Sequence, residues 1–144
     1  MNVKMKMASV FVLLIMVVSC ATTQSTAPEE SSNLPEKYRL DDLKSVNQIM
    51  KPKKSSFEEV DDQSVILQAN RGEYYLLVLR EPIDPYISKQ RTLGFSVSGT
   101  SVQAGADRIY VDHSSGTMHY FIEKIYRLKG RKQAEEIKER LRGS

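Results

Sequence analysis

The chain has 144 residues, of which 21 are basic and 18 are acidic. This length allows one small domain, and no shift in composition indicates a second. The formal net charge is +3. It falls to about +1 if Lys4 and Lys6 leave with an N-terminal signal, so the charge gives no reason to expect a nucleic-acid partner.

The first twenty residues have the features of an export signal. Lys4 and Lys6 precede an apolar run at residues 8–18, which is too short to span a bilayer as a helix. The run ends in VVSC, where Cys20 follows a small residue, and this pattern resembles the bacterial lipoprotein signal. The resemblance implies removal of residues 1–19 and acylation of Cys20. An ordinary signal peptide with a chance cysteine, or an uncleaved anchor, is the alternative.

Cys20 is the only cysteine of the chain. If it carries lipid, no thiol remains for a disulfide, a metal site or a nucleophile. Each buried methylene contributes about 0.8 kcal/mol, and two or more acyl chains make attachment effectively permanent. By resemblance to lipoprotein sorting, Ala21 after the cysteine implies the outer membrane. We therefore expect a protein held by its N-terminal lipid on the periplasmic side of the bacterial outer membrane.

Two segments precede the expected sheet. Residues 20–37 are rich in Thr, Ser, Pro and Glu and have almost nothing to bury, which predicts a flexible tether. Residues 38–50 place Leu40, Leu43 and Val46 at helix-like intervals, which predicts a short amphipathic helix. Pro52 disfavours helix in the residue before it, so this helix would end near residue 50.

From residue 55 onward the apolar pattern becomes strand-like. It predicts strands at residues 57–60, 65–69, 74–79, 93–97, 109–111 and 118–128. The last of these also fits a helix, but its aromatic and β-branched content favours a strand. Asn70-Arg71-Gly72 predicts a compact hairpin turn. Because residues 74–79 are apolar on both faces, either a closed small barrel or helices on the sheet must cover them.

The fold class expected is mainly β (α+β), with a small antiparallel sheet or barrel of about five or six strands at residues 38–130. A C-terminal amphipathic helix at residues 131–144 follows, with Ala134, Ile137 and Leu141 as its apolar stripe. Residues 124–142 hold eight basic and three acidic residues. This basic helix is either a solvated surface or a contact for anionic headgroups.

The segments VDDQSVILQANRGEYYLLVL, DRIYVD and FIEKIYRL resemble a proteobacterial family of small exported proteins classed as a domain of unknown function. The similarity covers roughly residues 50–128. It implies a compact β domain, export and no assigned activity. Many members look disulfide-linked, with one cysteine in the long loop and another in the last strand. Ile83 and Tyr120 occupy those two places here, and this departure from the family pattern argues against a redox role without changing the expected fold.

The sequence contains no catalytic motif in the structural setting that such a motif requires, so we expect that the protein is not an enzyme and binds no cofactor. The least weak candidate is Asp112, His113 and His119, which flank a turn and could form a metal or hydrolase site. Two exposed histidines beside a turn are the ordinary alternative. Tyrosines on the predicted strands could instead line a small-ligand site, although core packing is the more common role of such residues.

The loop at residues 80–92 is long for a small domain and contains Pro82 and Pro85. Ile83, Tyr86 and Ile87 are apolar side chains within it, which predicts a contact with an envelope partner. They could equally fold back over an open end of the β domain. The main hypothesis is a non-catalytic binding or structural accessory module, and the alternative is a small-ligand-binding β-barrel lipoprotein.

Overall fold

The structure is a computed structural model that describes residues 34–70, 72–86, 92–97, 99–114 and 116–144. Its contacts divide the chain into residues 1–30 and residues 31–144. The second unit, called the barrel domain here, contains every described residue. Cys20 and Ile87 therefore lie outside the described residues.

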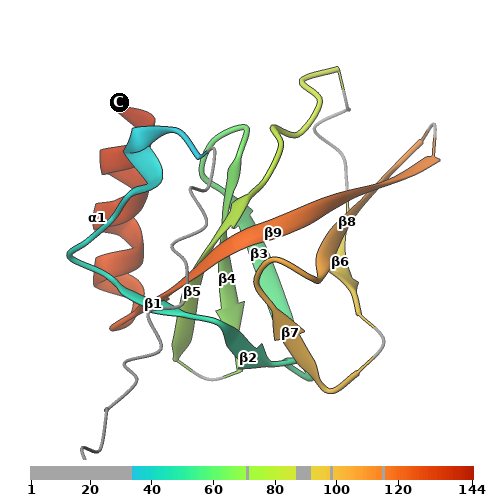
Figure 1. Ribbon diagram of the computed structural model, residues 1–144, viewed down its shortest axis with the longest axis horizontal. Helices are drawn as coiled ribbons and strands as arrows, with labels where there is room; N and C mark the ends of the chain where they lie inside the picture. The colour runs from blue at the N-terminus through green and yellow to red at the C-terminus, as the bar shows by residue number, and fades with distance from the viewer. Residues whose placement is uncertain (1–33, 71, 87–91, 98, 115) are drawn as a thin grey trace, which may run out of the picture. The chain divides into compact units, whose positions relative to one another are not determined.

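The barrel domain consists mainly of antiparallel strands, followed by one helix (Figure 1). The elements are η1 (Glu36–Tyr38), β1 (Lys44–Val46), β2 (Gln48–Met50), β3 (Ser55–Glu59), β4 (Ser64–Ala69), β5 (Glu73–Leu79), β6 (Thr92–Ser96), β7 (Ser101–Gln103), β8 (Arg108–His113), β9 (Gly116–Leu128) and α1 (Arg131–Arg142). Six strands follow the order β3-β4-β5-β9-β8-β6, β1 also pairs with β9, and β2 pairs with β7. The result is a nearly closed, barrel-like antiparallel sheet with a C-terminal helix.

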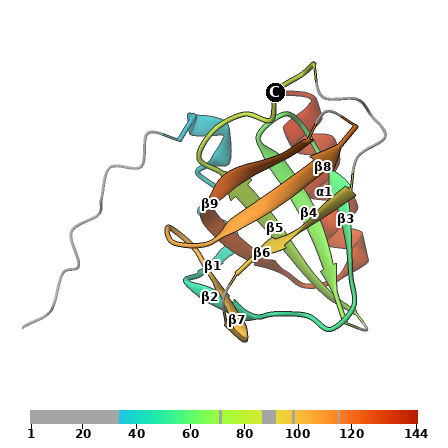
Figure 2. The same ribbon diagram turned by 90° about the vertical axis from the view of Figure 1, so that its right-hand side faces the viewer.

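The long strand β9 connects the two halves of the sheet. Its first part pairs with β8, and its second part has β5 on one edge and β1 on the other. The β5–β9 register shifts between Val78 and Leu79, so that two residues of β9 face one residue of β5. Such a bulge increases the local twist and bends the strand. Figure 2 shows the sheet curling around this strand.

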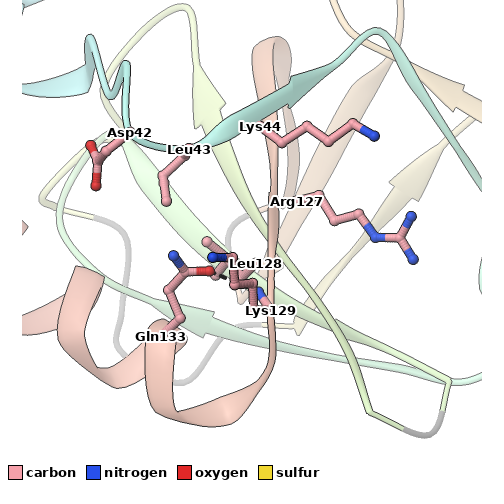
Figure 3. A pocket seen from close by; sticks show the side chains of 7 residues that line it. All are labelled: Asp42, Leu43, Lys44, Arg127, Leu128, Lys129 and Gln133. Carbon is pink, nitrogen blue, oxygen red and sulfur yellow. Dashed lines mark hydrogen bonds between the residues drawn. The ribbon is translucent and has the colours of Figure 1, made fainter.

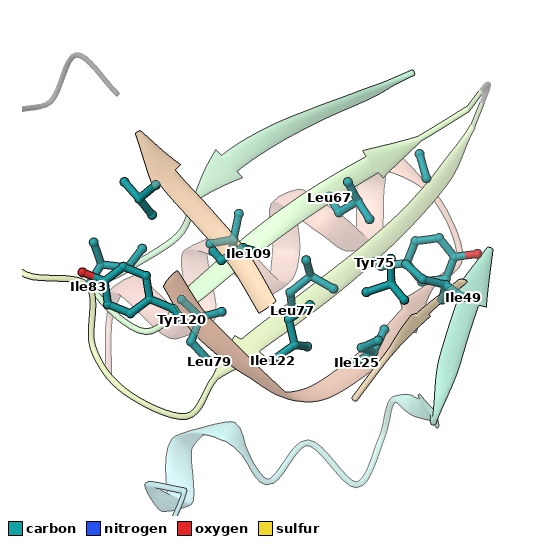
Figure 4. Close-up of a cluster of buried hydrophobic side chains, with 14 residues drawn as sticks. Ile49, Leu67, Tyr75, Leu77, Leu79, Ile83, Ile109, Tyr120, Ile122 and Ile125 are labelled. Atoms are coloured by element: carbon teal, nitrogen blue, oxygen red, sulfur yellow. The ribbon is translucent and has the colours of Figure 1, made fainter. Parts of the chain in front are cut away.

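Two apolar clusters cover the two faces of β5. Tyr75, Leu77 and Leu79 belong to the barrel interior, whereas Leu76 and Val78 belong to an outer cluster beneath α1. Figure 4 shows how side chains from β4, β5, β8 and β9 fill the interior. The strand that is apolar on both faces is thus covered both by barrel closure and by a helix, which are the two solutions that its sequence allowed.

The sheet closes incompletely between its edge strands β3 and β6, a place called the seam here. No strand pairing joins these two strands among the described residues. Phe57 of β3 and Phe95 of β6 nevertheless meet edge to face, with ring centroids 5.1 Å apart and planes inclined at 62°. This aromatic contact stabilises the approach of the two edges without backbone hydrogen bonds.

The hairpin of β4 and β5 forms where it was predicted. Asn70 and Gly72 both have positive φ, at 47° and 85°, and these residue types tolerate that conformation. The predicted strands and the C-terminal helix also appear, within a few residues of the expected ends.

The predicted helix at residues 38–50 is wrong. This segment holds a short 3₁₀ turn and the strands β1 and β2. Its apolar residues serve two different clusters: Leu40 and Leu43 pack in the outer one, whereas Ile49 lies in the barrel interior. The helix-like spacing therefore reflects a chain that passes from one face of the sheet to the other, and pairing with β9 and β7 overrides local propensity.

Candidate functional site

The residues predicted for a partner contact have different environments. Ile83 is 2% exposed and belongs to the barrel interior, and its N–H donates to the carbonyl oxygen of Asp62 at 2.6 Å. Tyr86 is 95% exposed. Ile87 lies outside the described residues. Ile83 thus folds back over the open end of the sheet, and of this trio only Tyr86 is shown at the surface.

Ile83 also lies beside Tyr120, as Figure 4 shows. The N–H of Asp84 donates to the Tyr120 hydroxyl oxygen at 3.2 Å. Ile83 and Tyr120 occupy the two places at which the resemblance implied cysteines in other members of the family. An apolar contact and a hydrogen bond therefore join the loop to β9 at the position where a disulfide would do so.

Asp112, His113 and His119 do not converge. Across the β8–β9 hairpin, His113 is opposite Gly116 and His119 is opposite Tyr110. Because side chains alternate along a strand, the two imidazoles lie on opposite faces of the hairpin. Asp112 accepts a hydrogen bond from the Thr117 hydroxyl at 2.9 Å. Within the described ranges, no group of three or more His, Cys, Asp or Glu side chains is arranged to hold a metal ion.

The barrel interior is filled by its own side chains. Fourteen buried residues make up the interior cluster, and they include Tyr75 and Tyr120. Tyr38 and Tyr126 are buried in the outer cluster. The tyrosines on the strands are therefore chiefly core residues and do not form an open platform.

A surface cavity lies at the seam, beside the loop that follows β5. It has a volume of about 600 Å³. Its walls come from β3 and the turn after it, from the start of the long loop, and from β6. The lining residues are Phe57, Glu58, Glu59, Val60, Asp61, Asp62, Ile83, Asp84, Pro85 and Leu93. This seam pocket combines an apolar floor with five carboxylates.

Asp61 is the most strongly held of these carboxylates. It accepts hydrogen bonds from Lys37 Nζ at 3.0 Å, Tyr38 Oη at 2.9 Å, the Gln63 N–H at 3.0 Å and Ser64 Oγ at 2.6 Å. Burial alone would raise the pKa of the Asp61 carboxyl, but these donors outweigh it and hold the pKa below its ordinary value. Burial and the bond to Asp61 raise the pKa of Tyr38. Both groups therefore keep their usual charge at neutral pH.

The other carboxylates give the pocket its negative rim. Glu58 pairs with Lys138 of α1 at 2.6 Å. Asp62 and Asp84 form no ion pair with any described residue, and Asp84 accepts from the Tyr86 N–H at 2.9 Å. Among the described residues, no strand pairs with the outer edge of β3. Arg142 donates to the carbonyl oxygen of Glu59 at the end of this strand, so an extended chain can hydrogen-bond along the part of the edge before Glu59. The pocket is suited to an extended segment that carries positive charge.

A second, smaller pocket lies where β1 and β9 meet the start of α1 (Figure 3). Its volume is about 230 Å³. Leu43 and Leu128 supply apolar surface, and Lys44, Arg127 and Lys129 supply positive charge. Lys44 and Arg127 are direct cross-strand neighbours, and Figure 3 shows their side chains extending in the same direction.

Neither pocket was clearly indicated by the sequence. The seam pocket is formed by residues 57–62, 83–85 and 93, which come from three separate parts of the chain. One signal was present: the run of four acidic residues within residues 58–62 is more than a tight turn requires. The part of the chain that the structure describes contains no helix long and apolar enough to cross a membrane.

The fold and site place the protein in a broad class: a small, mostly β domain with a nearly closed antiparallel barrel, one C-terminal helix and a pocket at the open seam. More particularly, residues 3–144 match the model of a family of unknown function, DUF6491, and the chain belongs to that family. No curated protein and no solved structure matches the chain significantly.

Proposed function

We propose that the protein is a lipid-anchored envelope protein of the bacterial outer membrane, facing the periplasm. In this proposal its barrel domain is a non-catalytic module that binds an extended, positively charged segment of an envelope partner. The observation that carries the proposal is the seam pocket, which joins an unpaired β edge to an acidic rim. The filled barrel interior and the position of Tyr86 also support binding at the surface.

Binding would use strand addition at β3. An extended segment gains affinity from backbone hydrogen bonds to an open edge, and pockets for alternate side chains give selectivity. Phe57, Ile83 and Leu93 offer an apolar contact at the floor. Lysine or arginine side chains of the segment would then reach Asp62 and Asp84, whose charges no described cation neutralises. Tyr86, next to this rim, offers a further contact.

Charge reversal in the pocket tests the partner site. We expect native protein extracted from membranes to retain its partner through purification, and Asp62→Lys/Asp84→Lys to lose it while unfolding at nearly the same temperature. The matched control is Glu136→Lys/Glu139→Lys, which makes the same change in charge on exposed positions of α1. If the pocket variant keeps the partner, or the helix variant loses it equally, binding does not occur at the seam.

The anchor is tested separately by intact mass. Detergent-extracted protein should begin at Cys20 and carry the mass of the acyl chains, whereas Cys20→Ser should be released from the membrane fraction. Recovery of an unmodified chain that still contains residues 1–19 would exclude lipidation, and it would leave the seam experiment unaffected.

A further inference from the structure

The end of the barrel domain opposite the C-terminus carries a group of unpaired cations. Figures 1 and 2 both place β1, β2, the end of β4, the beginning of β5 and the start of α1 toward this end. Its cations form two groups. Lys44, Arg127 and Lys129 lie around the β1–β9 pair, and Lys51, Lys53 and Lys54 lie in the connection from β2 to β3. All six are exposed. They are called the basic end here.

We propose that the basic end docks the barrel domain onto the surface of a bilayer that contains anionic phospholipid. This surface is distinct from the seam pocket. The proposal rests on the proposed membrane location for the identity of the bilayer, but the charges and contacts that carry it do not depend on lipidation of Cys20.

The first support is that these charges have no partner in the part of the chain that the structure describes. None of the six cations forms an ion pair with a described residue. Three cations in the second half of α1 differ: Lys138 binds both Glu58 and Glu135, Arg140 binds Asp42, and Arg142 donates to backbone carbonyl oxygens. The charges of the basic end are therefore available to an external anion, whereas those of the second half of the helix are engaged.

The second support is the arrangement of like charges. Lys44 and Arg127 are directly opposed across the β1–β9 pair, an arrangement that is unfavourable in an isolated sheet. The backbone holds the other three lysines in place: Pro52 is buried, the Lys51 N–H donates to the carbonyl oxygen of Thr100 at 2.8 Å, and the carbonyl of Lys54 accepts from Asn70. An external anionic surface would relieve the repulsion in both groups.

The third support is an exposed apolar side chain, which favours a bilayer over other anionic partners. Met50 is 75% exposed and immediately precedes the three lysines. Its backbone is fixed by pairing with Ser101. A flexible apolar side chain that projects among cations can enter the region between headgroups and acyl chains, while the lysines bind the phosphates. Nucleic acid or free phosphate offers no such apolar partner to Met50.

The fourth support is the charge at the other end. The turn between β3 and β4, whose Asp61 and Asp62 line the seam pocket, lies toward the same end as the C-terminus and away from β1 and β2 (Figure 1). A domain with opposite charges at its two ends is oriented electrostatically near a negatively charged membrane, with its basic end toward the membrane. Two acidic side chains near the basic end have partners of their own: Glu73 accepts a hydrogen bond from Asn70, and Asp42, which lines the small pocket beside Lys44, pairs with Arg140. Docking in this orientation leaves the seam open to a partner.

A single-site fluorescent label tests the proposal on the full lipidated protein. With Cys20 acylated, Met50→Cys supplies the only free thiol, and a polarity-sensitive dye attached there reports the environment. Met118→Cys, at the tip of the β8–β9 hairpin, is the matched control because Met118 is also partly exposed, at 42%. Each protein is reconstituted into vesicles of phosphatidylcholine, with or without phosphatidylglycerol.

We expect the dye at residue 50 to shift to shorter wavelength only when phosphatidylglycerol is present, and high salt to reverse the shift. The dye at residue 118 should not respond. In the Met50→Cys background, Lys53→Gln/Lys54→Gln should lower the ratio of docked to undocked protein about 30-fold, from the free energy of two charges near an anionic surface. Arg39→Gln/Lys124→Gln, with the same loss of charge elsewhere, should have little effect.

Several results would overturn the proposal. They are no shift at residue 50, an equal shift at both labels, a shift that follows protein concentration rather than phosphatidylglycerol, or a shift that inorganic phosphate or a DNA duplex reproduces without vesicles. Flotation with pure phosphatidylcholine vesicles reports the lipid anchor independently. Failure of the anchor and failure of docking are therefore distinguishable.

Discussion

Asp61 joins the segment before the barrel to the turn between β3 and β4. Its carboxylate accepts from Lys37 and Tyr38 on one side and from Gln63 and Ser64 on the other. Tyr38 is fully buried, and its carbonyl oxygen accepts from the Tyr126 hydroxyl at 2.7 Å. One side chain in the seam pocket is therefore also a structural connection, which is why Asp62 and Asp84 are the better positions for testing binding.

Asp61→Ala should lower the free energy of unfolding by about 2–3 kcal/mol, because it leaves several donors, Tyr38 among them, without their acceptor. Urea unfolding at neutral pH measures this loss. Asp62→Asn is the control, since no hydrogen bond to its side chain is seen among the described residues, and it should change stability by less than about 0.5 kcal/mol. Equal effects of the two variants would contradict the role given to Asp61.

The contribution of the Asp61 carboxylate to the free energy of unfolding should depend on pH in a defined direction. Its folded pKa is lowered, so its contribution is complete above the unfolded pKa of about 3.9 and is lost as the pH falls through the folded pKa. The difference in unfolding free energy between wild type and Asp61→Asn should therefore shrink below about pH 4. A difference that grows on acidification would show that the folded pKa is raised instead.

Gly94 leaves room for the ring of Tyr110, its partner across β6 and β8. A Cβ at residue 94 would stand 2.4 Å from atoms of that ring. Gly94→Ala should destabilise the domain by about 1 kcal/mol, because the half-buried ring must move. The cost should fall in a Tyr110→Ala background, which a double-mutant cycle measures. Gly99→Ala, with nothing within 4 Å of its Cβ, should be nearly neutral.

At the scale of elements, the sequence predicted the structure well wherever the apolar or turn residues of a single segment were sufficient to define it. The two apolar faces of β5 predicted two covering layers, and the turn at Asn70 and Gly72 located the hairpin. The helix predicted for the segment before β3 was wrong because Leu43 and Ile49 pack on opposite faces of the sheet. In the sequence, this arrangement has the same spacing as the single apolar stripe of a helix. The seam could not be predicted, because it depends on β3 and β6 being the two ends of the strand order.

Two residues of the long loop after β5 should have different roles: Ile83 stabilises the fold, and Tyr86 contacts the partner. Ile83→Ser should cost more than about 3 kcal/mol, since it removes a buried aliphatic side chain and places a hydroxyl in the interior. Tyr86→Ser should leave the melting temperature unchanged while weakening partner co-purification. Thermal melting and co-purification of both variants test this division. A Tyr86→Ser protein that is destabilised, or that binds its partner normally, would remove Tyr86 from the contact.

At the scale of the whole molecule, the barrel domain has different surfaces at its two ends. The seam pocket is acidic and bordered by an unpaired edge, whereas the basic end carries unpaired cations around Met50. The formal charge of the whole chain, +3, conceals this separation. One domain can therefore contact a bilayer and a cationic segment at the same time, because neither surface uses residues of the other.

The barrel domain should fold without residues 1–30 and without a disulfide or a bound metal. Its packing begins earlier than the expected tether boundary, since Leu34 and Tyr38 are 6% and 0% exposed. We expect residues 31–144 to melt in one transition at a temperature unaffected by reductant or chelator. Residues 39–144, which lack both side chains, should be less stable by at least about 3–5 kcal/mol, because the loss of one large core residue alone costs this much. Equal stability of the two truncated chains would show that the η1 segment is not part of the core, and a fall in melting temperature with chelator would reveal a metal requirement.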